Sequence, residues 1–141
     1  MLKRIPSILP PELLKVLMEM GHGDELVLAD GNYPRFGHPS RVIRCDGHGI
    51  PELLEAILQF MPLDQYVEHP VTLMAVLDGD PYVPEIWDTY RQIIAKHEKA
   101  GAKDKAVHKQ EFYQQAAAAY AVVTTSEAAL YANVILKKGV L

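Results

Sequence analysis

The 141-residue sequence has little of several features that would fix its class at once. Its single cysteine, Cys45, cannot form an internal disulfide, and a lone thiol suits a reducing compartment. No stretch reaches the roughly 18 consecutive apolar residues that a membrane-spanning helix needs. Prolines and charges interrupt the segment after Met1, so no signal peptide is expected. The sequence therefore predicts a cytoplasmic protein without a membrane partner.

Basic charge and ligand motifs are also scarce. Fourteen Lys and Arg against eighteen Asp and Glu give a net charge of −4, so no nucleic-acid partner is expected. The chain has no glycine-rich phosphate loop and no nucleophile elbow around a serine. Its six histidines are scattered without metal-ligand spacing, and none has a cysteine partner. Neither a metal nor another cofactor is predicted.

The composition is that of a globular domain. Apolar residues make up 49% of the chain and charged residues 23%, which is enough to build one hydrophobic core. No linker rich in proline or serine divides the sequence. We therefore expect a single domain over residues 1–141.

Apolar periodicity predicts alternating helices and strands. Helical spacing, in most cases opened by a proline, predicts helices over residues 11–20, 51–58, 84–97 and 110–119. Apolar runs predict strands over residues 25–29, 41–45, 71–77, 120–125 and 131–136. Residues 32–40 read as a loop, and residues 100–105 as a charged linker. The alternation is typical of an α/β domain with a largely buried sheet.

Carboxylates follow two of the predicted strands. Asp30-Gly31 comes directly after the first strand and Asp46-Gly47 after the second. Ligands of open α/β sheets collect beyond the ends of strands, so both carboxylates are candidates for a binding site. An Asp-Gly pair is also an ordinary turn, and the pattern alone does not decide between the two.

His22 is the strongest candidate for proton transfer. It lies between Gly21 and Gly23, which leave the backbone free and the imidazole uncrowded. Imidazoles give and take protons near neutral pH. The alternative is structural, because a histidine just after a helix often interacts with the carbonyl end of that helix.

Tyr131 and Asn133 form a second candidate pair. Placed two apart on the predicted last strand, both side chains would face the same side of the sheet. A hydroxyl and an amide together offer donors and acceptors, which suits a polyhydroxylated ligand. A polar beginning to a strand explains the two residues equally well.

At this point the sequence resembles a known family. The residues that carry the resemblance keep their order along nearly the whole chain: Pro11-Glu12-Leu13-Leu14-Lys15, Met20-Gly21-His22-Gly23-Asp24-Glu25, Ala29-Asp30, Val42-Ile43-Arg44-Cys45-Asp46-Gly47, Glu111-Phe112-Tyr113, and Tyr131-Ala132-Asn133 through Lys137-Lys138-Gly139-Val140. Together they are similar to the RbsD/FucU family of sugar mutarotases, and most of all to its L-fucose branch. The resemblance implies a three-layer α/β/α domain with a mixed sheet.

The resemblance also implies an activity. Such a protein is a cofactor-independent isomerase that interconverts the α and β anomers of L-fucose by opening and reclosing the sugar ring. His22 would be the catalytic acid, with Asp30 orienting either the imidazole or the sugar. Tyr131, Ala132 and Asn133 would line the pocket.

Lys109 departs from the family pattern. The family has a sugar-binding Arg or His at this position, and a lysine keeps the charge but not the planar fork of arginine. Two further side chains are weaker candidates for the sugar pocket: Tyr120, to hold hydroxyls, and Tyr33, to stack on the apolar face of the sugar.

The resemblance implies a homodecamer with sites between subunits. Ile86, Trp87, Tyr90 and Ile93 would give the helix from Pro84 more apolar surface than one contact needs. Two other activities stay open: a D-ribose pyranase, and a module of the same fold that binds a monosaccharide without catalysis.

Overall fold

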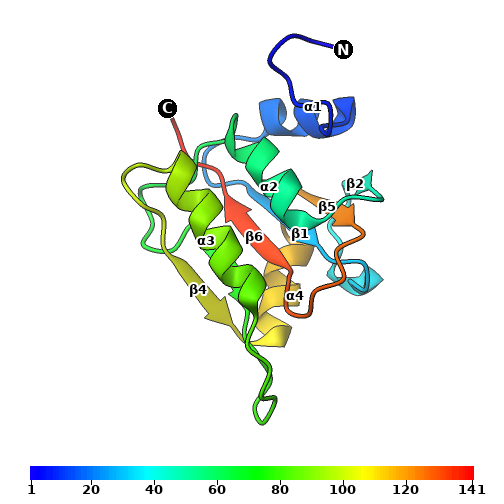
Figure 1. The fold of residues 1–141 in the computed structure, drawn as a ribbon, viewed down its shortest axis with the longest axis vertical. Coiled ribbons are helices and arrows are strands. Elements are labelled where there is room, and N and C mark those ends of the chain that lie inside the picture. The colour runs from blue at the N-terminus through cyan, green and yellow to red at the C-terminus, as the bar shows by residue number, and fades with distance from the viewer.

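The computed structural model describes residues 1–141, and Figure 1 shows the arrangement of their helices and strands. In chain order the elements are α1 (Pro11–Glu19), β1 (Glu25–Ala29), the short 3₁₀ helix η1 (Arg35–Gly37), β2 (Val42–Cys45), α2 (Ile50–Leu58), β3 (Val71–Met74), α3 (Glu85–His97), β4 (Asp104–Val107), α4 (Lys109–Ala117), β5 (Ala121–Thr125) and β6 (Val134–Lys137). Prolines open α1 and α2 and precede α3, as expected from their fixed φ and missing N–H.

The strands form one mixed six-stranded sheet in the order β2-β5-β1-β6-β3-β4. β6 runs antiparallel to both of its neighbours, β1 and β3, and every other pairing is parallel. The parallel strands therefore all end at one edge of the sheet, where β6 begins. We call this the carboxyl edge, and we call the opposite edge, where β1 begins and β6 ends, the amino edge.

Helices cover both faces of the sheet. Leu26 and Leu28 of β1 point into the main core, which α1, α2 and α3 cover. Val27 and Ala29 point the other way, into a smaller core that α4 completes. Because β1 is buried on both faces, its sequence is continuously apolar rather than alternating. The expected three-layer α/β/α fold with a largely buried mixed sheet is confirmed (Figure 1).

The apolar side of α3 packs inside the chain. Tyr90 is almost fully buried, and Ile86, Trp87 and Ile93 pack against the main core. This helix also packs along α2. Ile86, Trp87 and Ile93 are only partly buried there, so the expectation that this helix has more apolar surface than one contact needs stays a prediction.

Most predicted boundaries agree with the structure to within two residues, and three predicted segments differ more. The expected linker over residues 100–105 overlaps β4 (Asp104–Val107), an edge strand whose exposed residues need not be apolar. The third strand ends at Met74, three residues earlier than predicted. The Ala75 N–H still donates to the Val107 carbonyl, but β4 ends at Val107 and offers no partner beyond it. The last strand begins at Val134, after a left-handed residue (φ 56°) at Tyr131 that is incompatible with a strand.

Candidate active site

A pocket of about 320 Å³ opens at the carboxyl edge. Its lining comes from the segments that follow β1, β3 and β4 and the segment that precedes β6. The twelve lining residues are Asp30, Asn32, Tyr33, Pro34, Met74, Leu77, Asp80, Lys109, Tyr113, Leu130, Tyr131 and Asn133. The pocket thus brings together five of the candidates from the sequence: Asp30, Tyr33, Lys109, Tyr131 and Asn133. We call it the carboxyl-edge pocket.

Asp30 and Asn133 hydrogen-bond to each other in the lining of the carboxyl-edge pocket. Asp30 ends β1 and Asn133 precedes the neighbouring antiparallel strand, so the topology brings them side by side. The Asp30 N–H donates to Asn133 Oδ1 at 2.7 Å, and Asn133 Nδ2 donates back to Asp30 Oδ2 at 3.0 Å. Asn32 N–H also donates to Asp30 Oδ1 at 2.9 Å. Burial raises the pKa of Asp30, although these hydrogen bonds oppose the shift.

Tyr131 and Ala132 do not lie on a strand, so the geometric reason given for Tyr131 and Asn133 sharing a face is wrong. The carbonyls of both residues are occupied inside the chain. Trp87 Nε1 donates to the Tyr131 carbonyl at 2.8 Å, and the Tyr90 hydroxyl donates to the Ala132 carbonyl at 2.6 Å. Ala132 is fully buried and lies outside the pocket lining, whereas the Tyr131 side chain lines it.

Aromatic rings form one wall of the pocket. Tyr33 and Tyr113 meet edge to face with ring centroids 5.5 Å apart, and Phe36 packs on Tyr113 at 5.0 Å. Lys109 places its ammonium 5.9 Å from the centre of the Tyr113 ring. Tyr113 was not among the candidates from the sequence, but its position four residues after Lys109 puts both on one face of α4.

The amino edge carries a separate group of polar residues around His22. His22 Nε2 lies 3.1 Å from Asp64 Oδ1, and the same oxygen accepts the Tyr66 N–H at 3.0 Å. The His22 side chain is 45% exposed, whereas that of Asp64 is only 3% exposed. The N–H of Tyr66, and then the His22 imidazole, hold the pKa of Asp64 below its usual range. A buried carboxylate thus anchors an accessible imidazole.

Lys138, not His22, interacts with the end of α1. The Lys138 ammonium donates to the Leu17 carbonyl at 2.9 Å and also to the Met20 carbonyl. The Lys138 carbonyl accepts the Gly23 N–H at 2.8 Å, which ties β6 to the segment around His22. The structural alternative predicted that the His22 imidazole interacts with the carbonyl end of α1. In the structure, the Lys138 ammonium makes that interaction instead.

Within one chain, His22 and Asp30 are far apart. β1 lies between them, and its five residues alone cover about 13 Å. Tyr120 also lies at the amino edge, where its hydroxyl donates to Glu19 at 3.3 Å and its N–H to the Glu25 carbonyl at 2.9 Å. Tyr120 is therefore absent from the carboxyl-edge pocket, and Asp30 cannot orient the imidazole of its own chain.

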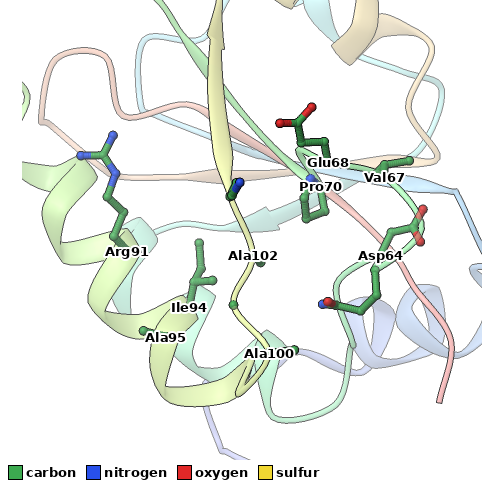
Figure 2. A pocket seen from close by; sticks show the side chains of 12 residues that line it. Asp64, Val67, Glu68, Pro70, Arg91, Ile94, Ala95, Ala100 and Ala102 are labelled. Carbon is green, nitrogen blue, oxygen red and sulfur yellow. The ribbon is translucent and has the colours of Figure 1, made fainter.

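A larger groove of about 480 Å³ separates α3 from the segment around residues 64–70. Figure 2 shows Arg91 and Asp64 on opposite sides of the view, with Ala100 and Ala102 on the segment between them. The Arg91 guanidinium is already held by Asp104 at 2.8 Å. The polar groups of this groove do not converge, so it is a poorer candidate site than the carboxyl-edge pocket.

Two further observations bear on the kind of site. The structure brings together no group of three His, Cys, Asp or Glu side chains that could hold a metal ion. None of its helices is both long and apolar enough to cross a membrane.

The fold and the pocket together define an α/β protein with a pocket lined by polar groups at the carboxyl edge of its sheet. Comparison with known proteins narrows this class. A family model, the RbsD / FucU transport protein family, matches residues 3–141. The chain belongs to this family.

Individual relatives match over almost their whole length. The L-fucose mutarotase of Actinobacillus pleuropneumoniae is 48% identical over 140 residues, which cover 99% of this chain and 97% of that protein. The crystal structure of a Streptococcus pneumoniae fucose mutarotase in complex with L-fucose superposes with a TM-score of 0.92, 51% identity and 99% coverage of both chains. Bacillus subtilis RbsD complexed with D-ribose shares the fold, with a TM-score of 0.74, 24% identity and coverage of 96% and 97%.

Proposed function

We propose that this protein is an L-fucose mutarotase, which interconverts the α and β anomers of the free sugar. The observation that carries the proposal is the His22–Asp64 pair, an accessible imidazole anchored by a buried carboxylate. Two of the relatives described above, which match this chain almost end to end, are an L-fucose mutarotase and a fucose mutarotase in complex with L-fucose. The carboxyl-edge pocket supplies the polar groups that such a sugar needs.

The reaction needs only an acid and a base. The acid protonates the ring oxygen, the bond from that oxygen to the anomeric carbon breaks, and the anomeric hydroxyl loses its proton to give an aldehyde. Rotation of the carbonyl face and reversal of these steps produce the other anomer. His22 supplies the proton to the ring oxygen, and a positioned group of this kind accelerates proton transfer about 10²–10⁴-fold.

The carboxyl-edge pocket holds the sugar. Asp30 and Asn133 fix each other by two hydrogen bonds and present their remaining lone pairs to sugar hydroxyls. Lys109 adds a cation at the rim, and the Tyr33–Tyr113 wall offers an apolar surface to a face of the ring. Tyr131 contributes its hydroxyl.

The acid and the pocket must come from different copies of the chain. His22 lies at the amino edge and the pocket at the carboxyl edge, with β1 between them. A homo-oligomer that places the amino edge of one copy on the pocket of another completes the site, and a homodecamer with sites between subunits is our proposal for its form. Large apolar side chains exposed away from α3, such as Leu2, Met18 and Phe36, are available for such contacts.

A cytoplasmic location is also part of the proposal. The structure keeps Cys45 as a free, buried thiol, which suits a reducing compartment.

Saturation-transfer NMR on free sugars tests the proposed activity. Irradiating one anomer of L-fucose should attenuate the signal of the other in the presence of the protein far more than in buffer alone. D-Ribose examined in parallel separates a fucose mutarotase from a ribose pyranase. Binding of L-fucose without faster anomer exchange would identify a non-catalytic module instead, and would contradict the proposal.

A further inference from the structure

The segment between β3 and α3 stands away from the body of the protein, as the narrow green loop at the bottom of Figure 1 shows. Asp80 fastens this loop. The Tyr131 hydroxyl donates to Asp80 Oδ2 at 2.5 Å, and the Tyr82 N–H donates to Asp80 Oδ1 at 2.9 Å. Both Asp80 and Tyr131 line the carboxyl-edge pocket, so this hydrogen bond lies at the proposed site.

Tyr131 is held from several directions. Its backbone has a φ of 56°, in the left-handed region that non-glycine residues seldom occupy. Trp87 holds its carbonyl, the Leu77 N–H lies 3.4 Å from its hydroxyl oxygen, and the Tyr82 ring lies 5.9 Å from its own. Strained conformations of this kind persist only where the surroundings determine them, and they cluster at functional sites.

The phenol has one proton, and Asp80 takes it. A tyrosine hydroxyl can donate one hydrogen bond and accept others. The Tyr131 proton is committed to a carboxylate, in a charge-assisted bond that is stronger than one between neutral groups. What the phenol oxygen still offers to the pocket is therefore a lone pair.

We propose that Asp80 is a positioning residue for sugar binding: by accepting the Tyr131 proton, it makes Tyr131 a hydrogen-bond acceptor that takes the proton of a sugar hydroxyl. This inference rests on the proposed function and deepens it. Asp80 does not need to touch the sugar, since each of its oxygens already accepts a hydrogen bond within the chain. The loop after β3 then forms one wall of the pocket, and the Asp80 carboxylate holds this loop in place.

A double-mutant cycle tests whether Asp80 acts through Tyr131. The variants are Asp80→Ala, Tyr131→Phe and the two combined, and the matched control is Asp78→Ala, an exposed carboxylate of the same loop. The dependence of anomer exchange on L-fucose concentration gives KM and kcat. Asp80→Ala should raise KM about five- to tenfold and leave kcat within about twofold. A KM change of this size is what the loss of one well-placed hydrogen bond to the sugar produces. The double variant should match Tyr131→Phe alone, because the effects of coupled residues are not additive.

Two more readouts separate positioning from a merely structural role. Asp80→Asn keeps a carbonyl oxygen that accepts the phenol proton, so its KM should lie nearer to the wild-type value than that of Asp80→Ala. Ultraviolet titration of the phenol, taken as the difference from Tyr131→Phe, should show a lower midpoint in Asp80→Ala, since Asp80 raises the pKa of Tyr131.

Three outcomes would overturn the inference: an unchanged KM in Asp80→Ala, effects that add in the double variant, or an equal effect from Asp78→Ala. The wild-type protein separates this failure from failure of the proposed function. If wild-type protein neither binds L-fucose nor accelerates its anomer exchange, the proposed function fails, and the role of Asp80 towards sugar fails with it. Normal wild-type exchange with no effect of Asp80→Ala overturns the Asp80 inference alone.

Discussion

The two edges of one sheet place a carboxylate in opposite electrostatic settings. At the carboxyl edge, burial raises the pKa of Asp30 and makes its charge costly. At the amino edge, the Tyr66 N–H and His22 lower the pKa of Asp64 and stabilise its charge. The first carboxylate is locked to an amide inside a pocket, and the second anchors an exposed imidazole. One edge therefore presents hydrogen-bonded polar groups in a pocket, and the other presents an accessible imidazole beside a charged carboxylate.

The distance between the edges decides how they can cooperate. Five strand residues separate them, so one chain cannot apply both groups to one small sugar. If both edges serve the proposed reaction, they must meet across a contact between copies. The proposed reaction therefore requires an assembly in which the amino edge of one copy contacts the carboxyl edge of another. Variants of the two edges can test this requirement.

The largest expected effect comes from removing one group at each edge. His22→Ala should lower catalysed anomer exchange about 10²–10⁴-fold, because the proposed acid is lost. Asp30→Ala should lose sugar binding and therefore most activity. When the two inactive variants are co-expressed and assemble together, sites that combine intact His22 with intact Asp30 should restore about a quarter of the wild-type rate, as random mixing predicts.

A mixture of variants from the same edge is the control. Asp30→Ala mixed with Asn133→Ala should stay inactive, because both residues belong to the pocket of one chain and no mixed site is complete. Circular dichroism and light scattering confirm that each variant folds and assembles. Failure of the His22 and Asp30 variants to complement, with mixed assemblies present, would show that the edges do not share a site.

The sequence revealed the two edges unequally. The strand over 25–29 is found as predicted, and because Asp30 follows it, the carboxyl edge could be anticipated from chain direction alone. Asp64 could not be anticipated, since it lies in an irregular segment 42 residues from His22 and no spacing rule connects them. The pattern of apolar residues also gave no indication that β6 runs antiparallel to β1 and β3. The mixed sheet was expected only from the resemblance to the family.

The pocket candidates illustrate the same limit. Tyr131 and Asn133 line the pocket, although the strand geometry that pointed to them does not exist. The residues were found because their polar chemistry stood out in an apolar segment. Tyr120 lies at the amino edge, on the same side of the sheet as His22, so its contact with a sugar stays a prediction.

A smaller effect, on stability, tests how the amino edge is held. A Cβ at Gly139 would lie 2.5 Å from the Leu63 carbonyl oxygen and 2.8 Å from Asp64 Cα, both backbone atoms. Gly139→Ala should therefore lower the free energy of unfolding by about 1–3 kcal/mol and displace Asp64 from His22. At Gly21, a Cβ would meet only the Asp24 carboxylate at 3.7 Å, an ordinary contact. Urea unfolding should place Gly21→Ala within about 1 kcal/mol of wild type; equal losses in both variants would contradict this account.

The smallest expected effect is a pH dependence of opposite sign at the two edges. The lowered pKa of Asp64 contributes stability above the unfolded value of about 3.9, and this stability is lost as pH falls through the folded value. The raised pKa of Asp30 contributes stability below about 3.9, which is lost as pH rises through the folded value. On acidification from pH 7 to 3, the Tm difference between wild type and Asp64→Asn should therefore shrink, while that between wild type and Asp30→Asn should grow. Parallel changes in the two differences would mean that the edges do not differ electrostatically, and that burial and hydrogen bonding do not separate a binding carboxylate from one that supports proton transfer.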